Sequence, residues 1–233
     1  MAEVKQFRYA ADNLGYLIYS ASQAVVVDGG AFRDILSFIR SRNLDLLWIS
    51  NTHSHADHMV GNRALLENSN ARYLSYFDLL DMRLLELNGS SITVYRTPGH
   101  TVDSVCFRTG RFLLTGDTLF NGTVGNCFSG DLKIFFHSVK RIMTLPGDTV
   151  IYAGHDYVRD SMKFARRLDP DNPDIDSFMK KYEPGHVLST LDDEFRINPY
   201  LRFNEERIVS LLKKRGLPVD TEWDRWKSLM SIE

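Results

Sequence analysis

The spacing of apolar positions along the chain changes near residue 155. Up to that point, short alternating or continuous apolar runs bounded by turn residues are typical of β-strands. They predict strands at residues 4–10, 14–20, 24–28, 46–50, 91–97, 104–109, 111–116 and 149–154. Apolar residues spaced three and four apart predict helices between these strands, at residues 32–42, 61–69 and 132–145.

Beyond His155 the helical spacing dominates, and no further strand is expected. Helices are predicted at residues 158–169, 172–182, 204–216 and 220–230. The pattern therefore indicates an α/β fold followed by a smaller helical region. We predict a boundary between residues 1–156 and residues 157–233.

Composition narrows the choice of partners and compartment. The net charge is −2 and the pI about 6.4, so neither nucleic acid nor an anionic membrane is an expected partner. Two cysteines far apart, Cys106 and Cys127, do not form a disulfide framework and fit a reducing cytosol. There is no apolar run of about 18 residues and no secretory pattern at the N-terminus. We expect a cytoplasmic monomer.

The strand at residues 46–50 leads directly into the segment THSHADH, residues 52–58. Alternate residues of an extended segment point the same way, so His53 and His55 can face one common point. Asp57 and His58 are adjacent and can face a second point nearby. Imidazole and carboxylate groups suit zinc, iron or manganese, whereas a solvated loop would be better served by Lys and Glu. The segment therefore predicts a metal site.

Three other strand ends each present a candidate ligand, namely His100, Asp117 and His155. One histidine after a strand is more often a surface or packing residue. These three residues therefore indicate metal ligands only in combination with the segment at 52–58. Because loops at strand ends build the sites of α/β folds, we expect them to converge. We predict two metal ions with Asp117 bridging them: one held by His53, His55 and His100, the other by Asp57, His58 and His155. Such a site leaves positions open for water, as catalysis requires.

These motifs resemble the metallo-β-lactamase superfamily. Within it, the segments DNLGYLI, TPGHT, TGDTLF, GHDYV followed by MKFA, and STLDDEFRINPYLR are similar to glyoxalase II, also called hydroxyacylglutathione hydrolase, and occur in the same order. The resemblance covers nearly the whole chain. It implies an αββα sandwich as catalytic domain, with a binuclear metal site, and a small C-terminal helical domain that helps to hold the thiol part of the substrate.

The resemblance also implies a reaction. The enzyme would hydrolyse a small-molecule thioester, S-2-hydroxyacyl-glutathione such as S-D-lactoylglutathione, to the acid and the free thiol, using a hydroxide that bridges two divalent metal ions. Asp57 would bind metal and orient the hydroxide. Asp28, at the end of the third strand, matches a carboxylate that lies behind the metal loop and orders it.

The substrate contacts match the family less fully. Tyr157 matches a tyrosine that touches the glutathione backbone, and Arg202 a basic residue near the glutathione carboxylate. In the segment TVGNCFSG, residues 123–130, Phe128 is kept, but Asn126 stands where the family has Lys or Arg. Glu206 stands at another basic position of the family, with Arg207 beside it. Because the loss of two cations weakens the capture of a carboxylate, we expect a different or less acidic carrier thiol.

Other functions fit the same ligands. A persulfide dioxygenase of similar fold would bind one iron through two histidines and the aspartate, and a related hydrolase would act on lactones or β-lactams. The long helical tail with the motif NPYLR argues against both. A domain that binds metal without catalysis is disfavoured because all seven expected ligands are present.

Overall fold

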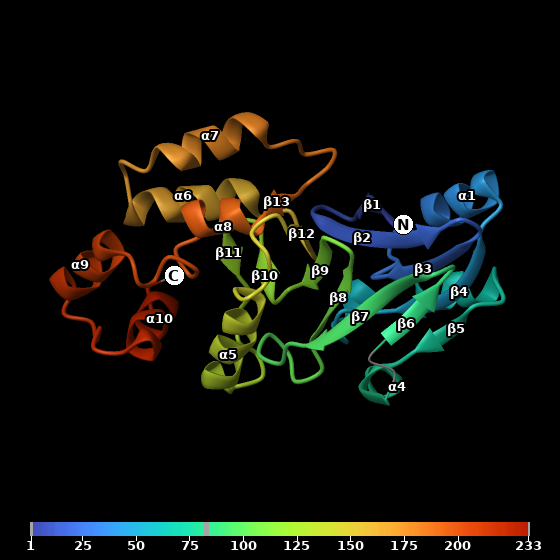
Figure 1. Cartoon of the computed structure of the whole chain (residues 1–233), viewed down its shortest axis with the longest axis horizontal. Coiled ribbons are helices and arrows are strands. Elements are labelled where there is room, and N and C mark those ends of the chain that lie inside the picture. Colours follow the sequence, from blue (N-terminus) through green and yellow to red (C-terminus); the bar gives the residue numbers. More distant parts are fainter. Residues whose placement is uncertain (1, 82–83, 233) are drawn as a thin grey trace.

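The computed structural model describes residues 2–81 and 84–232 and contains two β-sheets packed face to face (Figure 1). The first sheet has the order β1-β2-β3-β4-β5, with strands β1 (Glu3–Tyr9), β2 (Asn13–Ser20), β3 (Gln23–Val27), β4 (Asp45–Ser50) and β5 (Arg72–Leu74). The first three strands are antiparallel to one another, whereas β4 runs parallel to both β3 and β5.

The second sheet has the order β13-β12-β9-β8-β7-β6. Its strands are β6 (Leu84–Leu87), β7 (Ser90–Arg96), β8 (Val105–Thr109), β9 (Phe112–Gly116), β12 (Val150–Ala153) and β13 (Ser189–Thr190). Only the β9–β12 pairing within this sheet's described residues is parallel. A short hairpin of β10 (Leu119–Phe120) and β11 (Thr123–Val124) follows β9.

Alternation along the strands builds the layers. In β2, Tyr16 and Ile18 point into the core between the sheets, where they join Phe107 of the second sheet. Leu17 points the opposite way and packs with Ile35 of α1 (Phe32–Arg42). Helix α3 (Asn62–Glu67) lies in the same outer layer, and α2 (Ala56–Met59) and α4 (Tyr76–Asp81) are short helices in the loops that follow β4 and β5. The layered α/β sandwich expected from the sequence is thereby confirmed.

The remaining helices pack against the outer face of the second sheet or extend the core between the two sheets. They are α5 (Leu132–Ile142), α6 (Val158–Leu168), α7 (Pro173–Lys181), α8 (Leu191–Ile197), α9 (Glu206–Lys214) and α10 (Glu222–Met230). Trp226 of α10 is fully buried, with its ring centre 5.7 Å from that of Phe135 of α5. The C-terminal helices therefore share a hydrophobic core with the second sheet, and the boundary at residue 156 stays a prediction.

The expectation that no strand follows His155 is wrong. Strand β13, within the C-terminal region, pairs with the edge strand β12. It has only two residues, which is too short to leave an alternating pattern. The helix that follows it, α8, was also missed, although Thr190 and Asp193 form a capping box at its start. None of the helices in the described part of the chain has the length and hydrophobicity needed to cross a lipid bilayer.

Candidate metal centre

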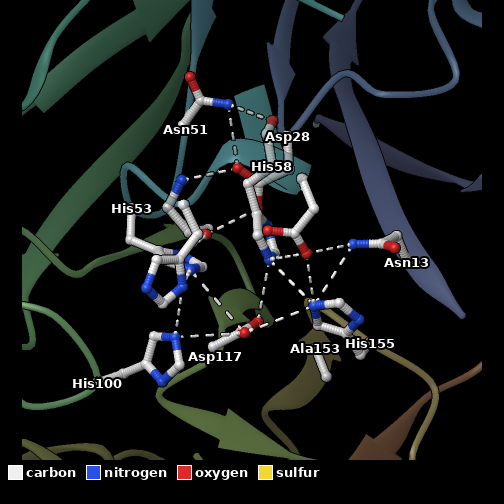
Figure 2. A network of polar contacts seen from close by, with 12 residues as sticks. Asn13, Asp28, Asn51, His53, His58, His100, Asp117, Ala153 and His155 are labelled. Atoms are coloured by element: carbon white, nitrogen blue, oxygen red, sulfur yellow. Dashed lines mark hydrogen bonds and ion pairs between the residues drawn. The ribbon is translucent and has the colours of Figure 1, made fainter. Parts of the chain in front are cut away.

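Every predicted ligand follows a strand. Figure 2 shows the side chains of His53, His58, His100, Asp117 and His155 close together. His53 and His55 lie in the loop between β4 and α2, and Asp57 and His58 are in α2 itself. The other three come from the second sheet: His100 after β7, Asp117 after β9 and His155 after β12.

The seven side chains form two groups. One group contains His53, His55, His100 and Asp117, and the other contains Asp57, His58 and His155. Within each group, one ligand atom from every residue lies within 4.8 Å of the others. This is the division expected from the sequence.

Asp117 lies between the two groups. Its carboxylate oxygens are 3.4 Å from His100 Nε2 in the first group and 3.4 Å from His58 Nε2 in the second. His155 Nε2 is 3.5 Å away. The position of this carboxylate suits a ligand shared by two ions.

The outer nitrogens of three histidines are held by oxygens that can only accept hydrogen bonds. These contacts are His58 Nδ1 to Asp28 Oδ2 at 3.0 Å, His155 Nδ1 to Asp12 Oδ1 at 2.9 Å, and His100 Nδ1 to the Asn126 carbonyl at 2.9 Å. Each Nδ1 therefore carries a proton. In the neutral ring the Nε2 lone pair then faces the centre, which is the orientation that a metal ligand requires.

Several histidine nitrogens and the Asp117 carboxylate, which face the centre, lack suitable hydrogen-bond partners in the protein. His55 Nδ1 lies 2.9 Å from His53 Nε2 and 3.1 Å from His100 Nε2, so ring nitrogens face one another. Asp117 Oδ1 is buried and makes no hydrogen bond within the described residues, although His58 Nε2 is 3.4 Å away. Cations between these atoms would satisfy both the nitrogens and the carboxylate, so the donor set fits two divalent ions with nitrogen and oxygen ligands.

The electrostatics also favour positive charge here. Burial, followed by the nearby His58, lowers the pKa of His53 to about 4, which keeps that ring neutral and ready to bind metal. Burial lowers the pKa of His58 as well, but the charges of Asp28 and Asp117 outweigh it, and the pKa of His58 rises to about 11. A proton on His58 thus provides the positive charge that an ion would otherwise supply, and metal binding would release it.

Two backbone features let the loops approach this closely. Asp28 is fully buried with a left-handed φ of 55°, and its carboxylate accepts hydrogen bonds from the Thr52 backbone N–H at 2.8 Å and the Thr52 hydroxyl at 2.7 Å. It therefore orders the start of the metal loop, at a cost in backbone strain. Gly154 precedes His155, and a Cβ at this position would lie 2.1 Å from Asp117 Oδ1.

Several supporting residues escaped the sequence analysis. Asn13 donates to Asp57 Oδ2 at 2.8 Å, Tyr9 donates its hydroxyl to the Asp57 carbonyl at 3.1 Å, and Asp12 holds His155. Asp12 and Asn13 open the segment DNLGYLI, which was noted only for its resemblance. Two polar residues immediately before a buried strand were the available signal.

A cavity of 420 Å³ lies beside the metal centre. Tyr157 lines it and stacks on His155, with ring centres 5.0 Å apart and an angle of 6° between the planes. Asn126 also lines it, whereas Phe128 is 64% exposed and packs its ring against His55 and His100. The complete lining is Phe120, Thr123, Val124, Asn126, Tyr157, Asp160, Ser161, Lys163, Phe164 and Arg167.

Arg202 does not line this cavity. Its guanidinium is buried and lies 2.6 Å from a carboxylate oxygen of Asp169 and 2.6 Å from one of Glu205. Its Nη1 is buried and has no hydrogen-bond partner among the described residues, and the contact of Arg202 with substrate stays a prediction. The cations that do line the cavity are Lys163 and Arg167 of α6, which the sequence analysis missed. Their spacing of four residues, on the helix that begins beside Tyr157, was the signal.

The comparisons with known proteins agree with this geometry. Residues 12–76 and 78–155 match the metallo-beta-lactamase superfamily, and residues 156–229 match the hydroxyacylglutathione hydrolase C-terminus. A hydroxyacylglutathione hydrolase from Pseudoalteromonas translucida (strain TAC 125) is 31% identical over 252 residues, covering 100% of this chain and 97% of that protein. Another from Pelagibacter ubique (strain HTCC1062) is 30% identical, covering 91% and 97%.

The crystal structure of ETHE1 from Myxococcus xanthus superposes with a TM-score of 0.65 at 24% identity, covering 97% of this chain and 99% of that one. At this identity the superposition shows a shared fold. The sequence matches go further, because they span both the sandwich and the C-terminal helices. The chain therefore belongs to the metallo-beta-lactamase superfamily, as a glyoxalase II-like hydrolase with two His/Asp clusters consistent with a binuclear metal site.

Proposed function

We propose that the protein is a metal-dependent thioester hydrolase of glyoxalase II type. Its substrate would be S-2-hydroxyacyl-glutathione, such as S-D-lactoylglutathione, or a related thiol ester, and its products the acid and the free thiol. The observation that carries the proposal is the convergence of seven ligand side chains in two groups, beside a cavity that Tyr157 lines.

The chain's own residues would hold the ions and prepare the attack. Two bound divalent ions would supply a Lewis acid for the thioester carbonyl and lower the pKa of water. Asp117, whose carboxylate lies between the two ligand groups, would help to hold both ions. The Asp57 side chain is 49% exposed, against 8% for Asp117, so Asp57 can reach a water molecule at the open side of the centre. Asn13 fixes its Oδ2 at 2.8 Å.

The leaving group needs little help. A thiol has a pKa of roughly 8.5, so the thiolate departs more easily than an alkoxide or an amine would. Burial and nearby carboxylates raise the pKa of Tyr157 to about 12, which keeps its hydroxyl protonated at neutral pH. Tyr157 can then donate a hydrogen bond to an amide carbonyl of the carrier, next to the metal centre.

The proposal is tested with protein stripped of metal and reloaded with zinc, iron or manganese. We expect two ions per chain by elemental analysis and hydrolysis of S-D-lactoylglutathione in the loaded protein. His155→Ala should lose one ion and most of the activity. His137→Ala is the matched control, because His137 is an exposed histidine of α5 that belongs to neither group. A protein that holds two ions and hydrolyses no thioester would refute the proposal.

A mononuclear iron dioxygenase is the alternative. The second complete group, Asp57, His58 and His155, argues against it, because one ion would leave three buried or half-buried ligands unused. One iron per chain together with oxygen uptake on glutathione persulfide would favour the alternative. Two ions and no oxygen uptake would favour the hydrolase.

A further inference from the structure

Two cations line the cavity at a distance from the metal centre. Tyr157 precedes the first turn of α6 and stacks on His155, whereas Lys163 and Arg167 line the cavity farther along the same helix. With a rise of 1.5 Å per residue, they lie about 9 Å and about 15 Å beyond Tyr157 along the helix axis. A substrate that starts at the metal centre and follows α6 would meet positive charge at that range.

A second cavity, of 540 Å³, adjoins the first one at Lys163 and Arg167, which line both. It lies against α6 and α7, which stand side by side in Figure 1. Its apolar lining comes from Met162, Ile175 and Met179. The basic side chains that line it are Arg159, Lys163, Arg166 and Arg167.

These basic side chains are only partly neutralised. Lys163 pairs with Asp160 at 2.7 Å, with both side chains highly exposed, and Arg166 pairs with Asp176. Arg167 forms no ion pair with any acid among residues 2–81 and 84–232, and its guanidinium lies over the Phe164 ring at 5.3 Å. Exposed ion pairs are weak, so an anionic ligand can compete for them.

Glutathione fits this arrangement poorly. Its thiol is on the central residue, and even through the longer γ-glutamyl arm a carboxylate lies within roughly 10 Å of the sulfur. With the sulfur at the metal centre, a carboxylate reaches the level of Lys163 along α6 but not that of Arg167, about 15 Å along the axis. Residue 126, which lines the first cavity nearer to the metal centre, is Asn and provides no charge. A pantetheine arm has two amide units beyond its thiol, and by the same backbone spacing it is roughly 15 Å long before its terminal phosphate.

We propose that the carrier thiol is of the phosphopantetheine type, as in coenzyme A, with its pantetheine arm along α6 and its phosphates at Lys163 and Arg167. The inference rests on the proposed function and names its substrate class. The adenosine part of coenzyme A would lie on the apolar lining of the second cavity. In the reaction, water adds to the acyl carbon, a C–O bond forms and the C–S bond breaks. The sulfur leaves with the electron pair and takes up a proton from the water, giving the acid and the free thiol.

From the sequence alone, the loss of two cations suggested either a different carrier thiol or a less acidic one. Lys163 and Arg167 place positive charge on the cavity wall along α6, which favours a different carrier that is longer and still anionic.

The test compares one 2-hydroxyacyl group on coenzyme A, pantetheine and glutathione. We expect kcat/KM for the coenzyme A thioester to exceed that for the pantetheine thioester by roughly tenfold, as two exposed charge pairs allow. The ratio should fall as salt is added. In the double variant Lys163→Glu/Arg167→Glu the ratio should fall to one or below. Lys213→Glu/Lys227→Glu makes the same charge change on exposed residues of α9 and α10 and should keep the ratio.

Binding provides a readout that needs no catalysis. Calorimetric titration of metal-free protein with coenzyme A should show saturable binding that is tighter than that of pantetheine and is lost in Lys163→Glu/Arg167→Glu. Equal kcat/KM values for the coenzyme A and pantetheine thioesters, or a higher value for glutathione, would overturn the inference and leave the proposed function standing. A metal-loaded protein that hydrolyses no thioester would overturn both.

Discussion

A buried glutamate beside the substrate cavity should make the stability of the fold depend on pH. Glu194 of α8 has no exposed surface. Its carboxylate accepts hydrogen bonds from the Gly122 backbone N–H at 3.0 Å, the Ser189 hydroxyl at 2.6 Å and the Asn198 amide at 2.8 Å. Gly122 lies in the turn between β10 and β11, so Glu194 anchors the hairpin that contributes Phe120 to the cavity.

The size and sign of the effect follow from one pKa. Burial raises the pKa of Glu194 from 4.5 to about 7, despite the donors around it. Between these two pH values the unfolded chain releases the proton while the folded chain keeps it, so stability falls as pH rises. Below pH 4.5 both states are protonated and the contribution is complete. Above pH 7 it is lost. At 1.36 kcal/mol per unit, the loss is about 3 kcal/mol.

Glu194→Gln removes the titration and keeps the shape of the side chain. The free energy of unfolding would be measured in urea from pH 4 to pH 8, with a chelator present so that metal loss at low pH does not contribute. We expect the variant to gain about 3 kcal/mol relative to the wild-type protein over this range. Glu206→Gln, the same change at an exposed position of α9, is the control. Parallel curves for the wild-type protein and Glu194→Gln would refute the reasoning.

Three further changes separate metal binding, stability and specificity. Asp28→Asn should weaken metal binding roughly 10–100-fold in a competition assay with a chelating dye, because an amide nitrogen would then face His58 Nδ1–H. Arg202→Gln should lower the free energy of unfolding in urea by up to about 3 kcal/mol, because it leaves the buried carboxylate of Asp169 with only the exposed Arg207, 3.3 Å away, as its cation. Asn126→Arg should raise kcat/KM for S-D-lactoylglutathione up to about fivefold, by restoring a cation that lines the cavity.

Each of these changes has an outcome that would count against it. Unchanged metal affinity in Asp28→Asn would mean that the loop is ordered without that carboxylate. A rise in KM for thioesters in Arg202→Gln, with normal stability, would identify Arg202 as a substrate contact. A lower kcat/KM in Asn126→Arg would contradict the interpretation of the loop at residues 123–130.

The metal centre was predictable because each of its ligands lies close in sequence to a recognisable pattern. Each ligand directly follows a strand whose apolar run is recognisable, and the strand end determines where the side chain lies. His53 and His55 lie in the loop before α2 and belong to the first group, as the alternation of an extended segment predicts, whereas Asp57 and His58 lie in α2 and belong to the second. Elements without a local pattern were missed: β13 has only two residues and exists because it pairs with β12.

The substrate contacts were not predictable from the sequence, because the tertiary partners of a side chain decide whether it is free to contact a substrate. Arg202 has the residue type and motif of a substrate contact, but Asp169, more than thirty positions earlier, neutralises it. Lys163 and Arg167 have the spacing of an ordinary solvated helix face, and only the packing of α7 and the β10–β11 hairpin around α6 turns that face into the wall of two cavities.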